Sequence, residues 1–219
     1  FANDNLSQRI TPGALVVDPN NSNLLYLGTE AIYYDFDTGD AIVPADLASG
    51  IFKSSNAGST WQHLSNNGLP TKTGFTNTQL DVVALLIDPA DSNVLWAGLT
   101  SLLDTGYSTI YRSSNAGASW TRFDEGINAS TELRSLTLDP QNHNILYAAA
   151  GGYEANPGRI YRGVWEPANQ SITWLSISVG LPAESAHSVL VDPFNPDVLH
   201  AGTDAGVAAD RNDVAVADF

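Results

Sequence analysis

A segment built around an Asp-Pro pair occurs four times in this chain, and this repeat limits how the chain can fold more than any other feature. The copies are VVDPNNSNLLYLG, LIDPADSNVLWAG, TLDPQNHNILYAA and LVDPFNPDVLHAG, and they align without gaps. Their Asp residues are Asp18, Asp88, Asp139 and Asp192, at intervals of 70, 51 and 53 residues. Self-similarity at a period of about fifty residues indicates a chain that stacks one supersecondary unit several times.

Each copy predicts two short strands on either side of a turn. The residues before Asp-Pro are apolar and β-branched, as in Val82 to Ile87, which is typical of a buried strand. Proline fixes φ, and the Asn, Ser and Asp side chains that follow cap local backbone groups, so this stretch predicts the turn. The run after the turn, such as Val94 to Gly98, predicts the second strand.

Two more strands follow in the first three units. The third alternates apolar and polar residues, which gives the strand one buried face. It is expected at 50–54, 109–113 and 159–163. The fourth begins at a tryptophan, which is Trp61, Trp120 or Trp174. Four strands in about fifty residues form a β-propeller blade. The sequence therefore predicts an all-β chain, a β-propeller of four-stranded antiparallel blades.

Between the third and fourth strands lie two related segments, SSNAGSTW (54–61) and SSNAGASW (113–120). Both resemble the Asp-box, or bacterial neuraminidase repeat, whose pattern is S-x-D-x-G-x-T-W, although both carry Asn at the Asp position. Asn56 can cap the turn, Gly58 supplies a positive φ and Trp61 fixes the hairpin in its blade, so we expect these residues to be structural. The resemblance implies a propeller similar to those of sialidases, xyloglucan hydrolases, sortilin-type receptors, photosystem assembly factors and lectins.

The repeats predict one propeller domain over 1–219 with about four blades. Their expected bounds are about 10–70, 76–128, 130–182 and 184–219. Two arrangements follow: a compact four-bladed propeller, or part of a larger one that another segment or another chain completes. We favour the second slightly, because most propellers that the chain resembles have more than four blades. His200 occupies the slot of Tyr26 and Trp96 in the repeat, so we expect it to pack between blades.

The charge balance excludes several classes of partner. The chain has 24 acidic and 9 basic side chains, a formal net charge of -15 and a pI near 4.2. Nucleic acids and anionic membranes both require clustered Lys and Arg, so neither is an expected partner. No apolar stretch is long enough for a membrane-spanning helix. The absence of Cys excludes disulfides, thiolate metal sites and a Cys nucleophile.

The loops between second and third strands share one face of a propeller, and we call it the loop face. Acids and tyrosines collect in these loops, on the face that propellers generally use for ligands. The residues that we expect to bind a ligand are Tyr33, Tyr34, Tyr107, Tyr153 and Glu154. Tyrosine rings can stack on sugars and carboxylates can meet a basic surface. The expected partner is therefore a protein or an oligosaccharide.

The longest of these loops contains the run DFDTGD, with Asp35, Asp37 and Asp40. Calcium prefers several carboxylate oxygens from one tight loop, so these three are the candidate metal ligands. The spacing does not match an EF-hand, and the competing interpretation is a solvated acidic turn. No cofactor is certain, and calcium is the one candidate.

Two acids stand where the xyloglucan hydrolases of this family place a catalytic Asp, in a T-D-x-G-G setting just after a blade's second strand. They are Asp204, in the run Thr203-Asp204-Ala205-Gly206, and Glu30. A glycosidase needs two carboxylates, and the second catalytic Asp of those enzymes comes from another propeller. In non-catalytic blades the same run is common, with Asp only capping the turn. Asp204 and Glu30 are therefore candidates, while enzymatic activity stays open.

A sialidase site is not expected, because its three arginines, its Tyr-Glu pair and an F-R-I-P segment cannot be assigned in this chain. The sequence instead predicts a non-catalytic binding or assembly module of a secreted or cell-surface protein, bacterial or archaeal. Such a module contacts its ligand or partner through the loop face. The alternative is a carbohydrate-active enzyme or a lectin that resembles the Asp-box glycoside hydrolases.

Overall fold

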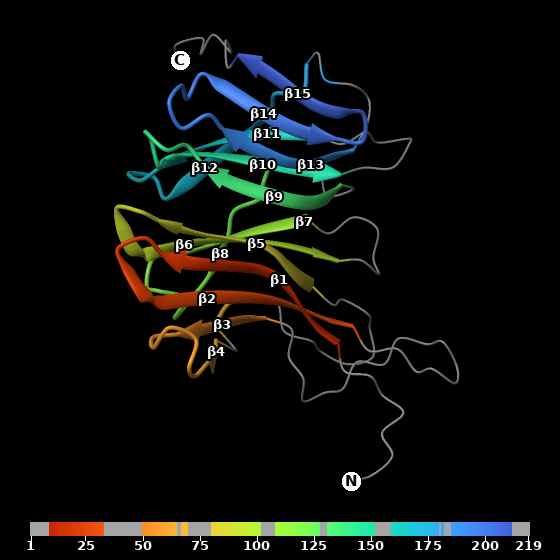
Figure 1. Cartoon of the computed structure of the whole chain (residues 1–219). Helices are drawn as coiled ribbons and strands as arrows, with labels where there is room; N and C mark the ends of the chain where they lie inside the picture. Colours follow the sequence, from red (N-terminus) through yellow and green to blue (C-terminus); the bar gives the residue numbers. More distant parts are fainter. Residues whose placement is uncertain are drawn as a thin grey trace, which may run out of the picture.

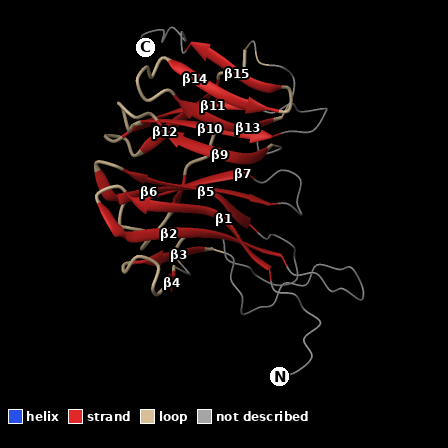
Figure 2. Ribbon diagram, in the orientation of Figure 1, coloured by secondary structure: helices blue, strands red, loops and turns tan. Residues whose placement is uncertain are grey.

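The computed structural model describes residues 9–32, 50–64, 67–69, 80–101, 108–127, 131–151, 159–179, 181 and 185–211. These residues form fifteen β-strands, and none of them lies in a helix (Figure 2). The predicted all-β fold class is confirmed.

The strands pair into four antiparallel sheets, one for each repeat, which we call blades 1 to 4 (Figure 1). Blade 1 contains β1 (Arg9–Asp18), β2 (Asn21–Ile32), β3 (Ile51–Ser54) and β4 (Gln62–His63). Blade 2 contains β5 (Leu80–Asp88), β6 (Asp91–Ser101), β7 (Ser108–Ser113) and β8 (Thr121–Arg122). Blade 3 contains β9 (Glu132–Leu138), β10 (Ile145–Gly151), β11 (Arg159–Glu166) and β12 (Ser171–Ser176). Blade 4 contains β13 (Ala186–Val191), β14 (Val198–Thr203) and β15 (Gly206–Arg211).

In every blade the spatial order of the strands is their order along the chain. The first two strands are joined at the Asp-Pro turn, where the Asp carboxylate accepts a backbone hydrogen bond. Asp18 Oδ1 accepts from Asn20 N and Asp88 Oδ1 accepts from Ala90 N, both at 2.8 Å. The turns of neighbouring blades are also linked, because Asn20 Nδ2 donates to Pro89 O at 2.8 Å. The repeated Asp therefore shapes its own turn, as its sequence context predicts.

A β-bulge interrupts the first strand of every blade at the same place. The register shifts between Pro12 and Ala14 in β1 and between Val82 and Ala84 in β5, with equivalent shifts in β9 and β13. The extra residue always lies five positions before the repeated Asp. These bulge residues are Gly13, Val83, Arg134 and His187. A bulge takes one residue out of the regular alternation of side chains between the two faces of the strand, so the side chain of that residue points in a new direction.

The hydrophobic core lies between blades. The first strand of each blade packs against the first strand of the next. One apolar cluster joins blades 1 and 2 around Tyr26 and Leu85, a second joins blades 2 and 3 around Trp96 and Trp165, and a third joins blades 3 and 4 around Tyr147. Arg112 lies over two of these rings, with Cζ 4.4 Å from the centroid of Trp165, and burial lowers the pKa of its guanidinium. Figure 1 shows the blades stacked in chain order, with blade 1 and blade 4 at opposite ends.

The two Ser-x-Asn-x-Gly hairpins (54–61 and 113–120) have the same structure, and we call them the box hairpins. In the first, Gly58 N donates to Ser54 Oγ at 2.9 Å and Thr60 N donates to Asn56 Oδ1 at 2.9 Å. The second repeats both bonds with Ser113 and Asn115. Asn therefore provides the acceptor at the Asp position of the pattern, so its replacement of Asp leaves the turn intact.

Candidate functional site

Asp204 lies in the two-residue turn between β14 and β15, at the end of the second strand of blade 4. Thr203 Oγ1 donates to Gly206 O at 2.9 Å across this turn. Asp204 N donates to Ser185 O at 3.2 Å, which ties the turn to the chain just before β13. The sequence-predicted candidate thus occupies a turn that is hydrogen-bonded on both sides and lies on the loop face.

The carboxylate of Asp204 pairs with an imidazole. Asp204 Oδ1 lies 2.7 Å from His187 Nε2, and the two side chains are 56% and 46% exposed. His187 is the bulge residue of β13, so the bulge places this side chain beside the turn. Sequence analysis missed His187, because a bulge depends on strand register that the local pattern does not specify.

Each blade carries one acid in the same row of the sheet, where the first strand begins and the second strand ends. Glu30 pairs in register with Thr11, Asp81 with Thr100 and Glu132 with Gly151, while Asp204 bonds to Ser185. The acid therefore lies on the second strand in blade 1, in the turn directly after the second strand in blade 4, and on the first strand in blades 2 and 3. Sequence analysis found Glu30 and Asp204 and missed the other two. The missing signal is an acid seven residues before the repeated Asp.

The acids of this row differ in their surroundings. Asp81 is buried at 1% exposure, and the Glu132 carboxylate forms an ion pair with Arg134, the bulge residue of its own strand. Glu30 belongs to β2. Among the acids of this row whose side chains the structure describes, Asp204 is by far the most exposed. Among these three described side chains, it is therefore the carboxylate that a ligand can reach.

The other predicted site residues lie outside the described residues. They are the ligand candidates Tyr33, Tyr34, Tyr107, Tyr153 and Glu154 and the calcium candidates Asp35, Asp37 and Asp40. Their roles remain predictions. Within the described ranges, no group of three or more His, Asp or Glu side chains could hold a metal ion. The same part of the chain contains no helix long and apolar enough to cross a membrane.

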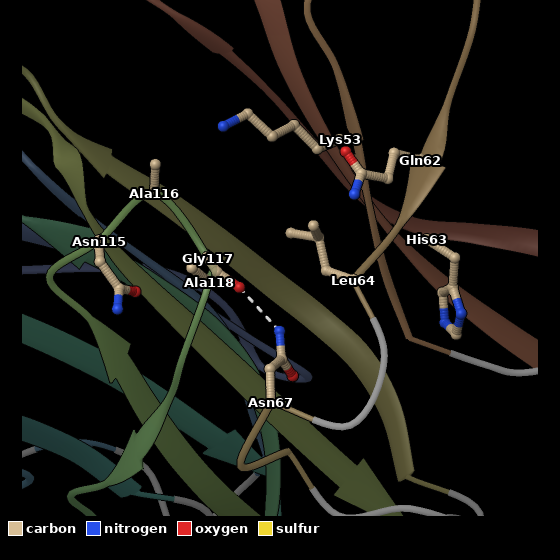
Figure 3. A pocket seen from close by; sticks show the side chains of 9 residues that line it. All are labelled: Lys53, Gln62, His63, Leu64, Asn67, Asn115, Ala116, Gly117 and Ala118. Carbon is tan, nitrogen blue, oxygen red and sulfur yellow. Dashed lines mark hydrogen bonds between the residues drawn. The ribbon is translucent and has the colours of Figure 1, made fainter.

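A separate pocket of about 320 Å³ lies between blade 1 and the box hairpin of blade 2 (Figure 3). Its lining includes Lys53, Gln62, His63 and Asn67, and Asn67 Nδ2 donates to Gly117 O at 2.7 Å. Burial lowers the pKa of His63, which favours its neutral form. None of the described lining residues is an acid, so they do not provide the carboxylates that glycoside hydrolysis needs.

No protein-family model matches the chain. By sequence, the chain is 28% identical over 156 residues to a xyloglucanase of Hypocrea jecorina (strain QM6a), a match that covers 67% of this chain and 17% of that protein. It is 26% identical over 215 residues to a xyloglucanase of Paenibacillus sp, which covers 91% of this chain and 19% of that protein. The chain therefore spans less than a fifth of the length of these two relatives.

Solved structures with the same fold include a GH74 enzyme from Niastella koreensis, with a TM-score of 0.58, 21% identity and coverage of 87% of this chain and 33% of that one. The K499G mutant of NanB sialidase from Streptococcus pneumoniae has a TM-score of 0.58, 15% identity and coverage of 90% and 28%. At these identities the likeness concerns the fold alone. It confirms the predicted β-propeller fold.

The expectation of a non-catalytic binding or assembly module is contradicted, because both sequence relatives are named as enzymes. The findings favour the alternative, a carbohydrate-active enzyme. The prediction set the enzyme aside because the run that contains Asp204 is also common in non-catalytic blades, where Asp only caps the turn. When two catalytic carboxylates lie in distant parts of a longer polypeptide, a segment of 219 residues can contain only one of them.

Proposed function

We propose that this chain is part of a glycoside hydrolase of the Asp-box type that cleaves xyloglucan, and that Asp204 is one of its two catalytic carboxylates. The observation that carries the proposal is the exposed Asp204 carboxylate, held in a hydrogen-bonded turn at the end of a blade's second strand. The names of the two sequence relatives provide the substrate. The expected partner is thus an oligosaccharide or polysaccharide.

The chemistry requires two carboxyl groups with different protonation states. One donates a proton to the glycosidic oxygen, and the other acts as a base on water or as a nucleophile. A hydrogen bond between His187 Nε2 and Asp204 Oδ1, at 2.7 Å, holds this carboxylate in place. This pairing favours the base or nucleophile role for Asp204. Neither of the other described acids of the row suits the role of proton donor, because Glu132 is engaged by Arg134 and Asp81 is buried, so we place the second carboxyl group outside these described side chains.

The box hairpins have a structural role in this proposal. Their Ser and Asn side chains are used within the turn, where Ser54 Oγ donates to Asn56 Oδ1 at 3.0 Å. They belong to the outer part of the blade, since each connects the third strand to the fourth. A polysaccharide substrate does not enter cells, so we expect the protein to act in the secreted or cell-surface location that its sequence predicts.

The test is hydrolysis of xyloglucan by the full-length polypeptide and by its Asp204→Asn variant, measured as newly formed reducing ends. Asparagine keeps the size and polarity of the side chain but can neither accept a proton nor attack as a carboxylate. We expect kcat to fall by roughly 100-fold or more, which is the usual contribution of a positioned acid–base group.

The matched control is Asp197→Asn, an exposed Asp in the turn between β13 and β14, at the opposite end of the blade from the loop face. Its turnover should equal that of the wild type. A variant at Asp204 that retains wild-type turnover would exclude the catalytic role. A wild-type protein without activity on xyloglucan would exclude the substrate.

A further inference from the structure

In blades 3 and 4 the bulge residue of the first strand contacts the acid of the row, which we call the row acid of its blade. In blade 3 the guanidinium of Arg134 forms an ion pair with the carboxylate of Glu132. In blade 4 the imidazole of His187 lies 2.7 Å from Asp204 Oδ1. The two row acids lie on different strands of their sheets, yet the bulge side chain reaches both of them. The bulge therefore directs its side chain along the row.

Blade 3 shows how an arginine occupies this place. Gly151 pairs in register with Glu132 and is the residue of blade 3 that corresponds to Asp204. A Cβ on Gly151 would lie 3.1 Å from Arg134 Nε. The Arg134 side chain thus lies over the position that Asp204 holds in blade 4, and the Glu132 side chain is only 14% exposed. The arginine both pairs with its row acid and lies where a second acid would be.

The imidazole of blade 4 engages only one oxygen of its row acid. An ionised carboxylate has no proton to donate, so the Nε2–H group of His187 is the donor and Asp204 Oδ1 is the acceptor. Within the part of the chain that the structure describes, no group donates to Asp204 Oδ2. The Asp204 side chain is 56% exposed. One oxygen of this carboxylate is therefore held while the other faces solvent.

A guanidinium can engage both oxygens of a carboxylate, and a pair in blade 2 does so. Arg122 donates from Nε to Asp124 Oδ1 at 2.7 Å and from Nη2 to Asp124 Oδ2 at 2.8 Å. The Asp124 side chain is 11% exposed. The forked geometry of arginine favours such paired bonds, whereas an imidazole turns a single N–H toward one acceptor. The kind of residue at the bulge therefore decides how many oxygens of the row acid stay open.

We propose that His187 is the positioning residue of Asp204. It anchors Oδ1 and leaves Oδ2 to meet the substrate, while arginine at the same place in blade 3 withdraws Glu132 from any ligand. The bulge residue thus determines which row acid of these two blades is available for chemistry. The part of this inference that concerns the substrate rests on the proposed function, and the part that concerns the contact between bulge residue and row acid does not.

A second histidine of blade 4 provides the matched control. His200 lies in β14, with Nε2 3.8 Å from Asp192 Oδ2 in the Asp-Pro turn, at the opposite end of the blade from Asp204. The structure differs here from the sequence expectation, since the His200 side chain is 40% exposed rather than packed between described blades. Its exposure is close to the 46% of His187. Substitution of His200 therefore removes a similar side chain without touching Asp204.

Hydrolysis of xyloglucan by full-length variants tests the positioning role. His187→Ala should lower kcat by roughly 10-fold to 100-fold, because a catalytic group that is misplaced by about 1 Å loses that much, while KM changes little. His187→Gln should restore most of this loss, because its amide N–H group can reach Oδ1. His187→Arg should not restore it, because a guanidinium can take both oxygens. His200→Ala should match the wild type. Wild-type kcat in His187→Ala would overturn the positioning role.

Carboxyl labelling of the same polypeptides with a carbodiimide and glycine ethyl ester, read by mass spectrometry, tests the contact without any enzymatic activity. Asp204 should react several-fold more slowly in His187→Arg than in the wild type. Glu132 should react several-fold faster in Arg134→Ala. Asp197, an exposed carboxylate at the opposite end of blade 4, is the reference that should react equally in all variants. Labelling of Asp204 and Glu132 that does not respond to these substitutions would contradict the role of the bulge residue.

The two measurements distinguish a failure of this inference from a failure of the proposed function. A wild type that does not hydrolyse xyloglucan, but whose labelling responds as expected, would reject the proposed function and retain the control of row acids by the bulge. An active wild type whose kcat and labelling are indifferent to residue 187 would do the reverse. The melting temperature of each variant should stay near that of the wild type, because the substituted side chains are 40% to 46% exposed. This measurement shows that a lost activity does not come from unfolding.

Discussion

Tyr26 illustrates how one side chain connects two blades and makes their contact sensitive to pH. It is fully buried, and its hydroxyl donates to Ala116 O of the next blade. Burial, together with the nearby negative charge of Asp18, raises the pKa of Tyr26 to about 12. The folded protein therefore stabilises the neutral phenol of Tyr26 relative to its ionised form.

This raised pKa predicts a loss of stability at high pH. In the unfolded chain Tyr26 ionises near pH 10, while in the folded protein it ionises near 12. Its contribution is thus fully present below pH 10 and disappears as the pH rises through 12. The free energy of unfolding, measured in urea at pH 8 and pH 11, should fall by an amount on the order of 1–2 kcal/mol more in the wild type than in Tyr26→Phe.

The control for this measurement is Val16→Ala, which weakens the same apolar cluster without removing a titrating group. It should keep the wild-type loss between the two pH values. At pH 8, Tyr26→Phe should cost about 1 kcal/mol, because the carbonyl of Ala116 loses its donor. An identical pH dependence in wild type and Tyr26→Phe would argue against this role of Tyr26.

At the scale of the element, the segment after the fourth strand decides how tightly two blades can approach. Gly68 and Gly206 both have a positive φ, of 96° and 115°, but only Gly68 faces a neighbouring backbone, because a Cβ added to it would lie 2.3 Å from Trp120 O. A Cβ on Gly206 would meet nothing within 4 Å. A comparison of substitutions at the two glycines therefore separates the energetic cost of backbone strain from that of steric overlap.

Replacing each glycine by alanine gives a matched pair. Gly206→Ala should destabilise the fold by about 1 kcal/mol, which is the strain of a left-handed alanine. Gly68→Ala should cost about 3 kcal/mol, because overlap with the Trp120 backbone adds to the same strain. Urea unfolding of the two variants measures the difference. Equal costs would mean that the blade contact relaxes without penalty.

The strands and turns were also the features that the sequence predicted most accurately. Strand alternation, Asp-Pro turns and box hairpins depend on neighbours along the chain, so the repeat and its Gly and Asn residues were enough to predict them. The pair His187–Asp204 and the acids Asp81 and Glu132 depend on register between strands. Their partners lie 17 to 19 positions away along the chain, and a bulge shifts the alternation between them. A pattern read along one strand does not contain that information.

At the scale of the whole molecule, the excess of negative charge lowers the stability of the stacked blades through mutual repulsion. Acids outnumber bases by 24 to 9, and the described ion pairs of Arg and Lys with acids involve only Arg122 and Arg134. Mutual repulsion is weaker when salt shortens the distance over which charges interact, from about 30 Å at 0.01 M to about 8 Å at 0.15 M. The net charge therefore has a measurable consequence for stability.

Raising sodium chloride from about 0.01 M to about 0.15 M should increase the melting temperature by a few degrees. The effect should shrink near pH 4, where the carboxylates become protonated and the net charge approaches zero. Differential scanning calorimetry at the two salt concentrations and at pH 4 and pH 7 measures both trends. A salt response that is unchanged at pH 4 would point to specific ion binding instead of charge repulsion.

The bulge in the first strand of every blade has a consequence for how such proteins can evolve. The bulge position holds Gly13, Val83, Arg134 and His187 in the four blades, four unlike side chains, while the core positions two and four residues later stay aliphatic. Of these four residues only Val83 packs against an apolar cluster, so the bulge position accepts unlike side chains more readily than the strand positions that form the clusters. Each repeat thus offers one position beside the loop face where new chemistry can arise by a single mutation, and duplication of the repeat multiplies the number of such trials.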